Sequence, residues 1–189
     1  MKKGFTLIEL LIVIGILAVL ATAVILVLNP AQILAQARDS QRISDLSSVK
    51  SAIGLYLATA TGTPTINAST TCTATGCNNP FSGGTLVITS STAIDGTGWV
   101  AVNLNGTSGG SALSSLPLDP IQNATYFYAF KGDSTNRTFE LDGRLESNKY
   151  RDMMTSDGGD KNSCGTDYGT GNSSSTCFYE IGTEPGLDL

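Results

Sequence analysis

The feature that most constrains this chain is an apolar run from Phe5 to Leu28 that carries a single charge, the carboxylate of Glu9. The run has 24 residues and would be roughly 36 Å long as a helix, enough to cross a bilayer. A carboxylate in hydrocarbon is costly unless a cation pairs with it, and the run itself supplies none. If the chain is cut after Gly4, Phe5 gains an α-amino group that can pair with Glu9 of the same or of a neighbouring copy.

The run begins with the segment Gly4-Phe5-Thr6-Leu7-Ile8-Glu9-Leu10, directly after two lysines. This order of basic leader, glycine, phenylalanine and glutamate resembles the type III signal of type IV pilins and of the pseudopilins of type II secretion systems. The resemblance implies a leader of residues 1–4, cleavage after Gly4 by a prepilin peptidase, and N-methylation of Phe5. The basic leader is expected to stay in the cytoplasm under the positive-inside tendency.

The resemblance also gives Glu9 and Thr6 candidate roles in assembly, because both match the family pattern. We expect Glu9 to pair with the new amino terminus, so that many apolar helices can pack side by side with their charges matched. For Thr6 an equally good explanation is a hydroxyl that donates to a helix carbonyl. A membrane anchor without an assembly role would explain the apolar run but not the acid within it.

One long helix is predicted from Phe5 to about Ala58, kinked at Asn29 and Pro30, because proline lacks a backbone donor and disfavours helix at the preceding residue. Residues 5–30 form the transmembrane and assembly part of this helix, and residues 31–60 form its amphipathic second half. Apolar residues of the second half recur at three- and four-residue spacing, at Leu46, Val49, Ile53 and Tyr56. The charged residues between positions 38 and 50 are expected on the other faces.

Residues 61–189 are predicted to form a β-rich globular head that covers this apolar stripe. Short β-branched or alternating segments indicate strands at 85–89, 98–104, 126–130, 137–141 and 177–181. A long loop is expected at 61–85, another polar loop at 158–175, and short helical turns at 111–116 and 145–154. Connection by hairpins predicts an antiparallel sheet with one apolar face. The predicted fold is α+β, a long helix packed by its second half on a small antiparallel sheet, as in the pilin fold.

The four cysteines, Cys72, Cys77, Cys164 and Cys177, all follow the helix. An even number of cysteines in an exported domain indicates two disulfides. We expect Cys72 to pair with Cys77 and Cys164 with Cys177, although four cysteines allow three pairings. A zinc site is the alternative, but the chain lacks both histidine and paired C-x2-C spacing.

Asp157 and Asp160 flank two glycines in the loop near the C-terminal end. Hard oxygen ligands on a flexible loop suit Ca²⁺, and the resemblance adds that major pseudopilins have a calcium site in a comparable loop. The EF-hand pattern is absent, however, and acidic residues in turns are commonly only solvated. Calcium therefore stays an option, and we expect no other cofactor.

Composition narrows the classes of function. The net charge is −5, and it becomes −7 once the two leader lysines are removed, so strong nonspecific binding of nucleic acid is not expected. The chain has no histidine, no recognised nucleophile context, and no P-loop or dinucleotide fingerprint. We therefore do not expect an enzyme.

The sequence thus predicts a structural subunit of a type IV pilus-like extracellular filament that serves adhesion, motility or DNA uptake. Such a subunit is a homo-oligomer whose partners are the prepilin peptidase and the pilus assembly machinery. It is expected in the inner membrane as a single-pass precursor and then on the cell surface. The alternatives are a pseudopilin of a type II secretion system and a minor tip pilin or adhesin.

Overall fold

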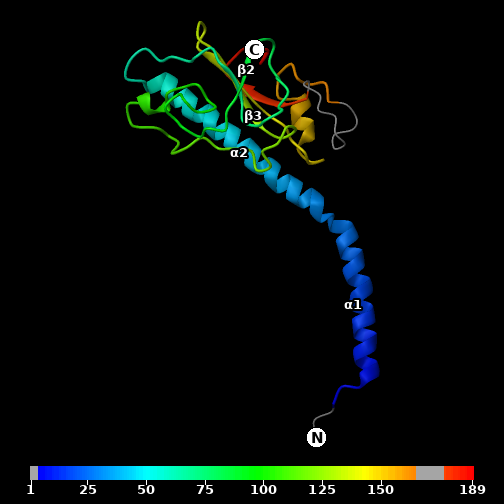
Figure 1. The fold of residues 1–189 in the computed structure, drawn as a ribbon. Coiled ribbons are helices and arrows are strands. Elements are labelled where there is room, and N and C mark those ends of the chain that lie inside the picture. The colour runs from blue at the N-terminus through cyan, green and yellow to red at the C-terminus, as the bar shows by residue number, and fades with distance from the viewer. Residues whose placement is uncertain (1–3, 165–176) are drawn as a thin grey trace. The chain divides into compact units, whose positions relative to one another are not determined.

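The computed structural model describes residues 4–164 and 177–189, and Figure 1 shows the fold. The helices are α1 (Leu7–Leu28) and α2 (Pro30–Thr59), together with two short 3-10 helices, η1 (Leu104–Gly106) and η2 (Arg151–Thr155). The strands are β1 (Thr70–Cys72), β2 (Leu86–Ile88), β3 (Tyr128–Asp133), β4 (Thr138–Gly143) and β5 (Tyr179–Gly182). Helices followed by one small sheet confirm the predicted α+β class.

The chain divides into two compact units, Met1–Ala35 and Gln36–Leu189. The first unit holds α1 and the first turns of α2, and the second unit holds the rest of α2 and the whole sheet. The second unit is the head.

α1 is apolar on all sides. Its described large side chains are exposed, from 44% for Val13 to 80% for Leu7. A helix of this kind needs lipid or other helices to cover it. The stretch Leu7–Ile25 has a mean hydropathy of 2.8 and is long enough to cross a membrane. This stretch lies within residues 5–30, which the sequence predicts as the transmembrane segment.

Asn29 separates α1 from α2. Its backbone lies in the left-handed region, with φ 40° and ψ 76°, which asparagine tolerates better than most residues. Pro30 is the first residue of α2, a position where a missing N–H leaves no hydrogen bond unmade. The amides of Gln32 and Ile33 both donate to the Asn29 carbonyl, at 2.9 and 3.3 Å. The helical path is therefore interrupted at the dipeptide that the sequence singles out.

The sheet has the strand order β2-β1-β3-β4-β5. β3 and β4 form an antiparallel hairpin in which Tyr128 lies opposite Gly143 and Asp133 lies opposite Thr138. β5 is antiparallel to β4 on the other side, and β1 is antiparallel to β3. The strands predicted at 126–130, 137–141 and 177–181 correspond to β3, β4 and β5, shifted by one to three residues.

The prediction of a purely antiparallel sheet is wrong, because β1 and β2 run parallel. Thr70 lies opposite Leu86 and Cys72 lies opposite Ile88. Parallel neighbours need a crossover of about a dozen residues, and residues 73–85 provide one. β1 lies within residues 61–85, which the sequence predicts as a loop because they are low in charge and rich in threonine, serine, asparagine and glycine. In the structure the hydroxyl of Thr71 donates to the carbonyl of Trp99, so a polar strand can be fully buried.

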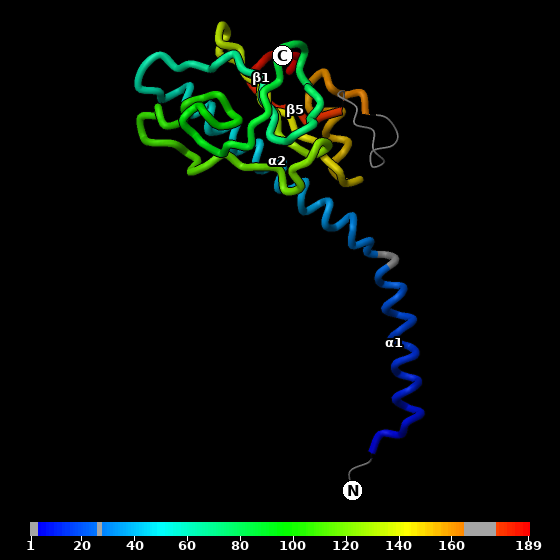
Figure 2. The backbone as a smooth tube through the Cα atoms, in the orientation of Figure 1, coloured from blue at the N-terminus to red at the C-terminus, as the bar shows by residue number. Residues whose placement is uncertain are grey.

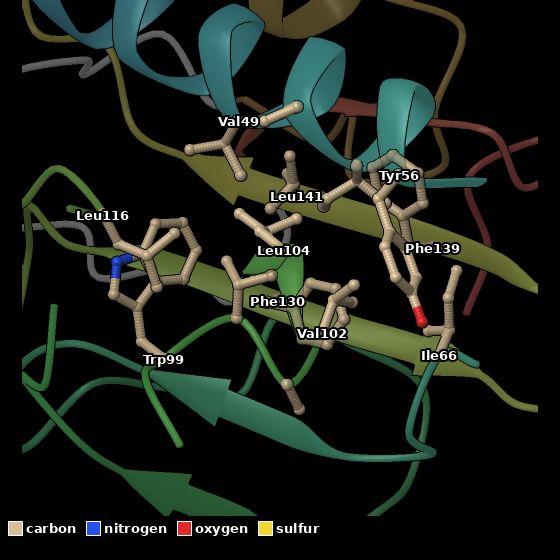
Figure 3. Close-up of a cluster of buried hydrophobic side chains, with 14 of the residues drawn as sticks. Val49, Tyr56, Ile66, Trp99, Val102, Leu104, Leu116, Phe130, Phe139 and Leu141 are labelled. Carbon is tan, nitrogen blue, oxygen red and sulfur yellow. The ribbon is translucent and has the colours of Figure 1, made fainter. Parts of the chain in front are cut away.

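α2 packs against one face of the sheet, as Figure 3 shows. The α2 side chains in this core include the predicted stripe, Leu46, Val49, Ile53 and Tyr56. Figure 3 shows Val49 and Tyr56 of α2 beside Phe130, Phe139 and Leu141 of the strands. The three aliphatic residues of α2 have no exposed surface. The amphipathic pattern therefore identifies the buried face of α2 correctly.

The strand predicted at 98–104 is wrong: this segment is irregular and ends in η1. Both sides of the segment are covered, since the buried residues are Trp99, Val100, Val102 and Leu104. The alternation of apolar residues therefore does not indicate a strand with one exposed face. The amide of Leu104 donates to the Ile94 carbonyl, and the amide of Trp99 donates to the Ser91 carbonyl. In Figure 2 this green stretch lies beside the cyan part of α2 and closes the core.

Of the two short helical turns predicted, the one at 111–116 is wrong and the one at 145–154 is confirmed in its last residues. Residues 111–116 contain no helix and are held by a hydrogen bond from the Leu116 amide to the Thr92 carbonyl. Within 145–154 the helical residues are those of η2, which begins at Arg151. Most of the polar loop predicted at 158–175 lies outside the described residues.

Leu46→Ala should lower the free energy of unfolding of the head by about 2–5 kcal/mol, because a fully buried leucine leaves a cavity when it is truncated. The measurement is urea unfolding of the full chain in detergent, followed by Trp99 fluorescence. Leu55→Ala on the same helix is the matched control, since Leu55 is 42% exposed and should cost much less. Equal losses in the two variants would contradict this assignment of the buried face.

Candidate functional site

The first turn of α1 is closed by a reciprocal contact between Thr6 and Glu9. Thr6 is the N-cap, with φ −81° and ψ 150°, and its Oγ1 accepts a hydrogen bond from the Glu9 amide at 3.3 Å. In return, Oε2 of Glu9 accepts from the Thr6 amide at 2.9 Å and from the Thr6 hydroxyl at 2.7 Å. This is a capping box, which satisfies two backbone donors that a helix start leaves open.

The capping box fixes where the single acid of the apolar run points. The two hydrogen bonds from Thr6 draw the Glu9 carboxylate back to the start of α1, one residue from Phe5. Both bonds that the carboxylate accepts end on Oε2, and a carboxylate oxygen pair can accept more than two bonds. The carboxylate is therefore placed at the end of the helix where cleavage after Gly4 would create an amine.

Sequence reasoning named both residues but not this contact. The spacing Thr-x-x-Glu before an apolar run is itself the sequence signature of a capping box. Thr6 also uses its hydroxyl on a side chain rather than on a helix carbonyl, which was the alternative explanation for this residue. That back-bonding does occur at Thr22, whose hydroxyl donates to the Ala18 carbonyl at 2.8 Å.

A second polar cluster is buried in the head and was not anticipated. Arg42 on α2 has no exposed surface and donates to three carboxylates, Asp39 at 2.8 Å, Asp119 at 2.6 Å and Glu146 at 2.9 Å. Arg38, one turn earlier, donates to Glu146 at 2.5 Å. The charged residues of α2 were expected on faces other than the apolar stripe, but Arg42 and Asp39 are fully buried in the head.

Burial alone would lower the pKa of Arg42, but the hydrogen bonds and charges of its three partners, led by Asp119, hold that pKa above its ordinary value. Burial would likewise raise the pKa of Glu146, but hydrogen bonds from Arg38 and Arg42 bring that pKa below its ordinary value. The cluster joins α2 to the Pro117–Pro120 turn and to the segment after β4. It fixes the position of the head on its helix.

Arg42→Met should destabilise the head by about 3–5 kcal/mol, because it leaves carboxylates buried without their cation. Lys50→Met is the matched control, since Lys50 lies exposed on the same helix and should change little. Urea unfolding of the full chain in detergent at pH 7 measures both. A loss below about 1 kcal/mol for Arg42→Met would show that the cluster does not hold the head together.

The lowered pKa of Glu146 gives the pH dependence a definite sign. A carboxyl whose folded pKa is depressed contributes stability above its unfolded pKa of about 4.5, and that contribution is lost as the pH falls through the folded value. The stability difference between the natural chain and Glu146→Gln should therefore be largest near pH 7 and shrink as the pH falls below about 4.5. Unfolding curves at a series of pH values test this, and a difference that stays constant would refute it.

The cysteines pair in sequential order. Cys72 bonds to Cys77, with Cα atoms 6.7 Å apart, and Cys164 bonds to Cys177, with Cα atoms 4.8 Å apart. The first bridge closes the turn that follows β1. The second joins the residue before the 165–176 segment to the one after it and so ties the start of β5 to the preceding loop.

Asp157 and Asp160, the residues considered for calcium, are engaged with backbone and side-chain donors. Asp157 accepts from the Gly159 amide through Oδ1 at 3.2 Å and from the Glu180 amide through Oδ2 at 2.9 Å. Asp160 pairs with the Lys161 ammonium. A calcium site formed by these two residues stays a prediction.

Three other acids come together on the sheet: Glu140 and Asp142 of β4 and Glu180 of β5. One carboxylate oxygen from each lies within 4.8 Å of the other two, and none of the three residues has exposed surface. Sequence reasoning missed them because polar residues alternating along a strand are expected to face water. The available signal was the spacing Glu140-x-Asp142, which places both on one face of β4.

The surroundings of these acids disfavour their charged forms. Burial raises the pKa of Asp142 well above its ordinary value, and the negative charges of Glu140 and Glu180 raise it further. Burial also raises the pKa of Glu180, to about 8, and raises the pKa of Glu140. Three carboxyl groups at neutral pH therefore need protons or a cation from outside.

These features define a class of protein: an α+β chain with the pilin architecture, whose apolar N-terminal helix carries one capped acid in its first turn. Residues 1–25 match the family model described as the prokaryotic N-terminal methylation motif. This motif is the prepilin signal of type IV pilins and pseudopilins, which confirms the resemblance found in the sequence. The signal implies processing by a prepilin peptidase, and the pilins and pseudopilins that carry it are structural proteins. No match was found among curated proteins or among solved structures.

Proposed function

We propose that this protein is a subunit of a type IV pilus-like extracellular filament and polymerises through α1 after cleavage between Gly4 and Phe5. The observation that carries the proposal is the position of the Glu9 carboxylate. It is drawn back to the first turn of a helix whose described apolar side chains are exposed. The methylation motif at residues 1–25 supports the processing step.

Cleavage after Gly4 changes the charge balance of the stem, by which we mean Phe5 to Leu28 of the mature chain. It removes two lysines with the leader and makes the α-amine of Phe5 the nearest cation to Glu9. Methylation of an amine leaves its positive charge in place. The stem of each copy then carries one cation and one anion at the same end, so the pair can be matched within one copy or between neighbours.

Packing of the stems follows from the chemistry of α1. In the membrane its side chains contact lipid, and in a filament they would contact other copies of α1. Because lipid and neighbouring helices are about equally apolar, the hydrophobic term nearly cancels, and packing and polar contacts decide how the helices align. An unmatched carboxylate would be costly in that interior, so pairing of Glu9 with an amine selects one register.

Under this proposal the protein is first a membrane-bound precursor and then part of a surface filament. The precursor resides in the inner membrane through Leu7–Ile25, where the prepilin peptidase and the assembly machinery act on it. The head then lies outside, where two disulfides are chemically stable. Adhesion, motility and DNA uptake are the roles of such filaments.

Glu9→Gln should leave the protein processed and in the membrane but lower the amount of filament in sheared surface material by at least about tenfold, the effect of losing roughly 1.4 kcal/mol per contact. The change keeps the size of the side chain and removes its charge. Asp152→Asn is the matched control, because it makes the same kind of change at a head side chain that is 84% exposed. Quantitative immunoblots of sheared and membrane fractions measure the outcome.

Mass spectrometry of the natural filament subunit completes this test. We expect a chain that begins at Phe5 and carries one added methyl group on its amine. A mature chain that still begins at Met1, or normal filaments from Glu9→Gln, would refute the assembly mechanism. A correctly processed protein that is absent from sheared fibres would instead favour the pseudopilin role, and a trace amount would favour a minor tip pilin.

A further inference from the structure

The three buried acids lie on one face of two paired strands. Asp142 lies directly opposite Glu180 in the antiparallel pairing of β4 and β5, and Glu140 is two residues from Asp142 on the same face. This face is the one turned away from α2, because Phe139 and Leu141, the alternate residues of β4, belong to the core against that helix. The cluster is thus built into the regular part of the fold and not into a loop.

The hydrogen bonds around the acids leave one set of oxygens without donors. Oε2 of Glu140 accepts from the Leu189 amide at 3.0 Å, and Oε2 of Glu180 accepts from the Lys161 amide at 2.8 Å. The other oxygens of both glutamates, and both oxygens of Asp142, are buried and have no hydrogen-bond partner among the described residues. Each glutamate is therefore anchored by one oxygen, and its second oxygen faces the other carboxyl groups, which can be satisfied by shared protons or by a cation.

The nearby cations are engaged elsewhere. The Lys161 ammonium pairs with Asp160, and the Lys131 ammonium, from the β3 residue opposite Glu140, donates to the Ser82 carbonyl at 2.7 Å. Arg144 donates to the Cys177 carbonyl at 3.2 Å. Within the part of the chain that the structure describes, no ion pair joins a lysine or arginine to any of the three acids. The charge of Lys161 acts to lower the pKa of Glu140 and Asp142 but does not outweigh their burial. A buried carboxylate without a partner is strongly unfavourable.

The loop around Glu180 is shaped to this carboxylate. Gly159 approaches Glu180 so closely that a Cβ at position 159 would overlap the carboxylate. The neighbouring Asp157 accepts from the Glu180 amide and so holds the same residue from its backbone side. The loop residues thus cover the cluster and fix the Glu180 side chain without neutralising it.

We propose that Glu140, Asp142 and Glu180 bind a hard divalent cation. Three carboxylates with no sulfur or nitrogen ligand are the donor set preferred by Ca²⁺ and Mg²⁺. Two oxygens on one Ca²⁺, each at 2.3–2.6 Å, can lie up to about 5 Å apart, whereas two oxygens on one Mg²⁺ lie at most about 4.2 Å apart. The three oxygens lie within 4.8 Å of one another, a separation that the longer bonds of Ca²⁺ span more readily than those of Mg²⁺.

A bound cation would connect three parts of the head through side chains that are already anchored. Glu140 holds Leu189, Glu180 holds the loop at Lys161, and Asp142 lies between them in the sheet. The ion would therefore stabilise the edge formed by β5 and the chain segments on either side of it. This role is separate from assembly through α1, so either proposal can fail without the other.

The test is thermal unfolding of the full chain in detergent at pH 7.5, after treatment with a chelator and dialysis. We expect CaCl₂ at about 100 times its Kd to raise the melting temperature by roughly 5–10 °C, and MgCl₂ to raise it less. Atomic emission after gel filtration should find one Ca²⁺ per chain. If neither ion shifts the melting temperature, the carboxyl groups are held by protons and the proposal is wrong.

Asp142→Asn is the diagnostic variant, since it keeps the shape of the side chain while removing a buried charge, and it should therefore fold. It should weaken Ca²⁺ binding at least tenfold and abolish the shift in melting temperature. The matched control is Asp152→Asn, which removes an exposed carboxylate outside the cluster and should keep the shift. A shift that survives in Asp142→Asn would overturn the proposal, and Glu180→Gln provides the same comparison if Asp142→Asn does not fold.

Discussion

The head depends on the burial of one face of α2. Its strands are three to six residues long and cannot enclose a core by themselves. Leu46, Val49 and Ile53 supply the apolar layer on which β3 and β4 pack, and the irregular residues 99–116 close that layer from the side. Since α2 continues directly from the segment that follows α1, the same element that organises the head also leads into the stem.

Acidic side chains are removed from water in three ways in this protein. Glu9 bonds to the backbone and hydroxyl of the helix start, so its charge is held by local donors. Glu146 and its neighbours surround Arg42, so their charge is held by a cation of the chain. Asp142 has neither kind of partner among the described residues. The second arrangement is complete within the head, whereas the third needs protons or a cation that the described residues do not supply.

The sequence predicts best where one local pattern decides the structure. The apolar run, the break at Asn29, the stripe on α2 and the β3–β4 hairpin each follow from spacing or from a single backbone rule. The methylation motif is likewise read from consecutive residues, and the family model confirms it. Within the candidate site, Glu9 and Thr6 are identified because they belong to that short segment.

The sequence predicts poorly where burial is decided by distant segments. The sequence of β1 is typical of a polar loop, but in the fold Trp99 and β3 cover it. The sequence of 98–104 is typical of a strand, but this segment is not part of the sheet. Arg42 and Asp142 look like surface charges, because only the folded chain brings their surroundings together. Three-residue strands and buried charges carry too little local signal to be distinguished from loops and solvated side chains.

The backbone at Asn29 bears on how a stem built from this helix would unwind. A helix unwinds residue by residue, because each hydrogen bond supports the next one. Pro30 donates no hydrogen bond, and Asn29 already has a non-helical backbone, so that continuity ends between Leu28 and Pro30. If α1 packs into a filament, this joint would allow α1 and α2 to lose or keep their helical structure separately.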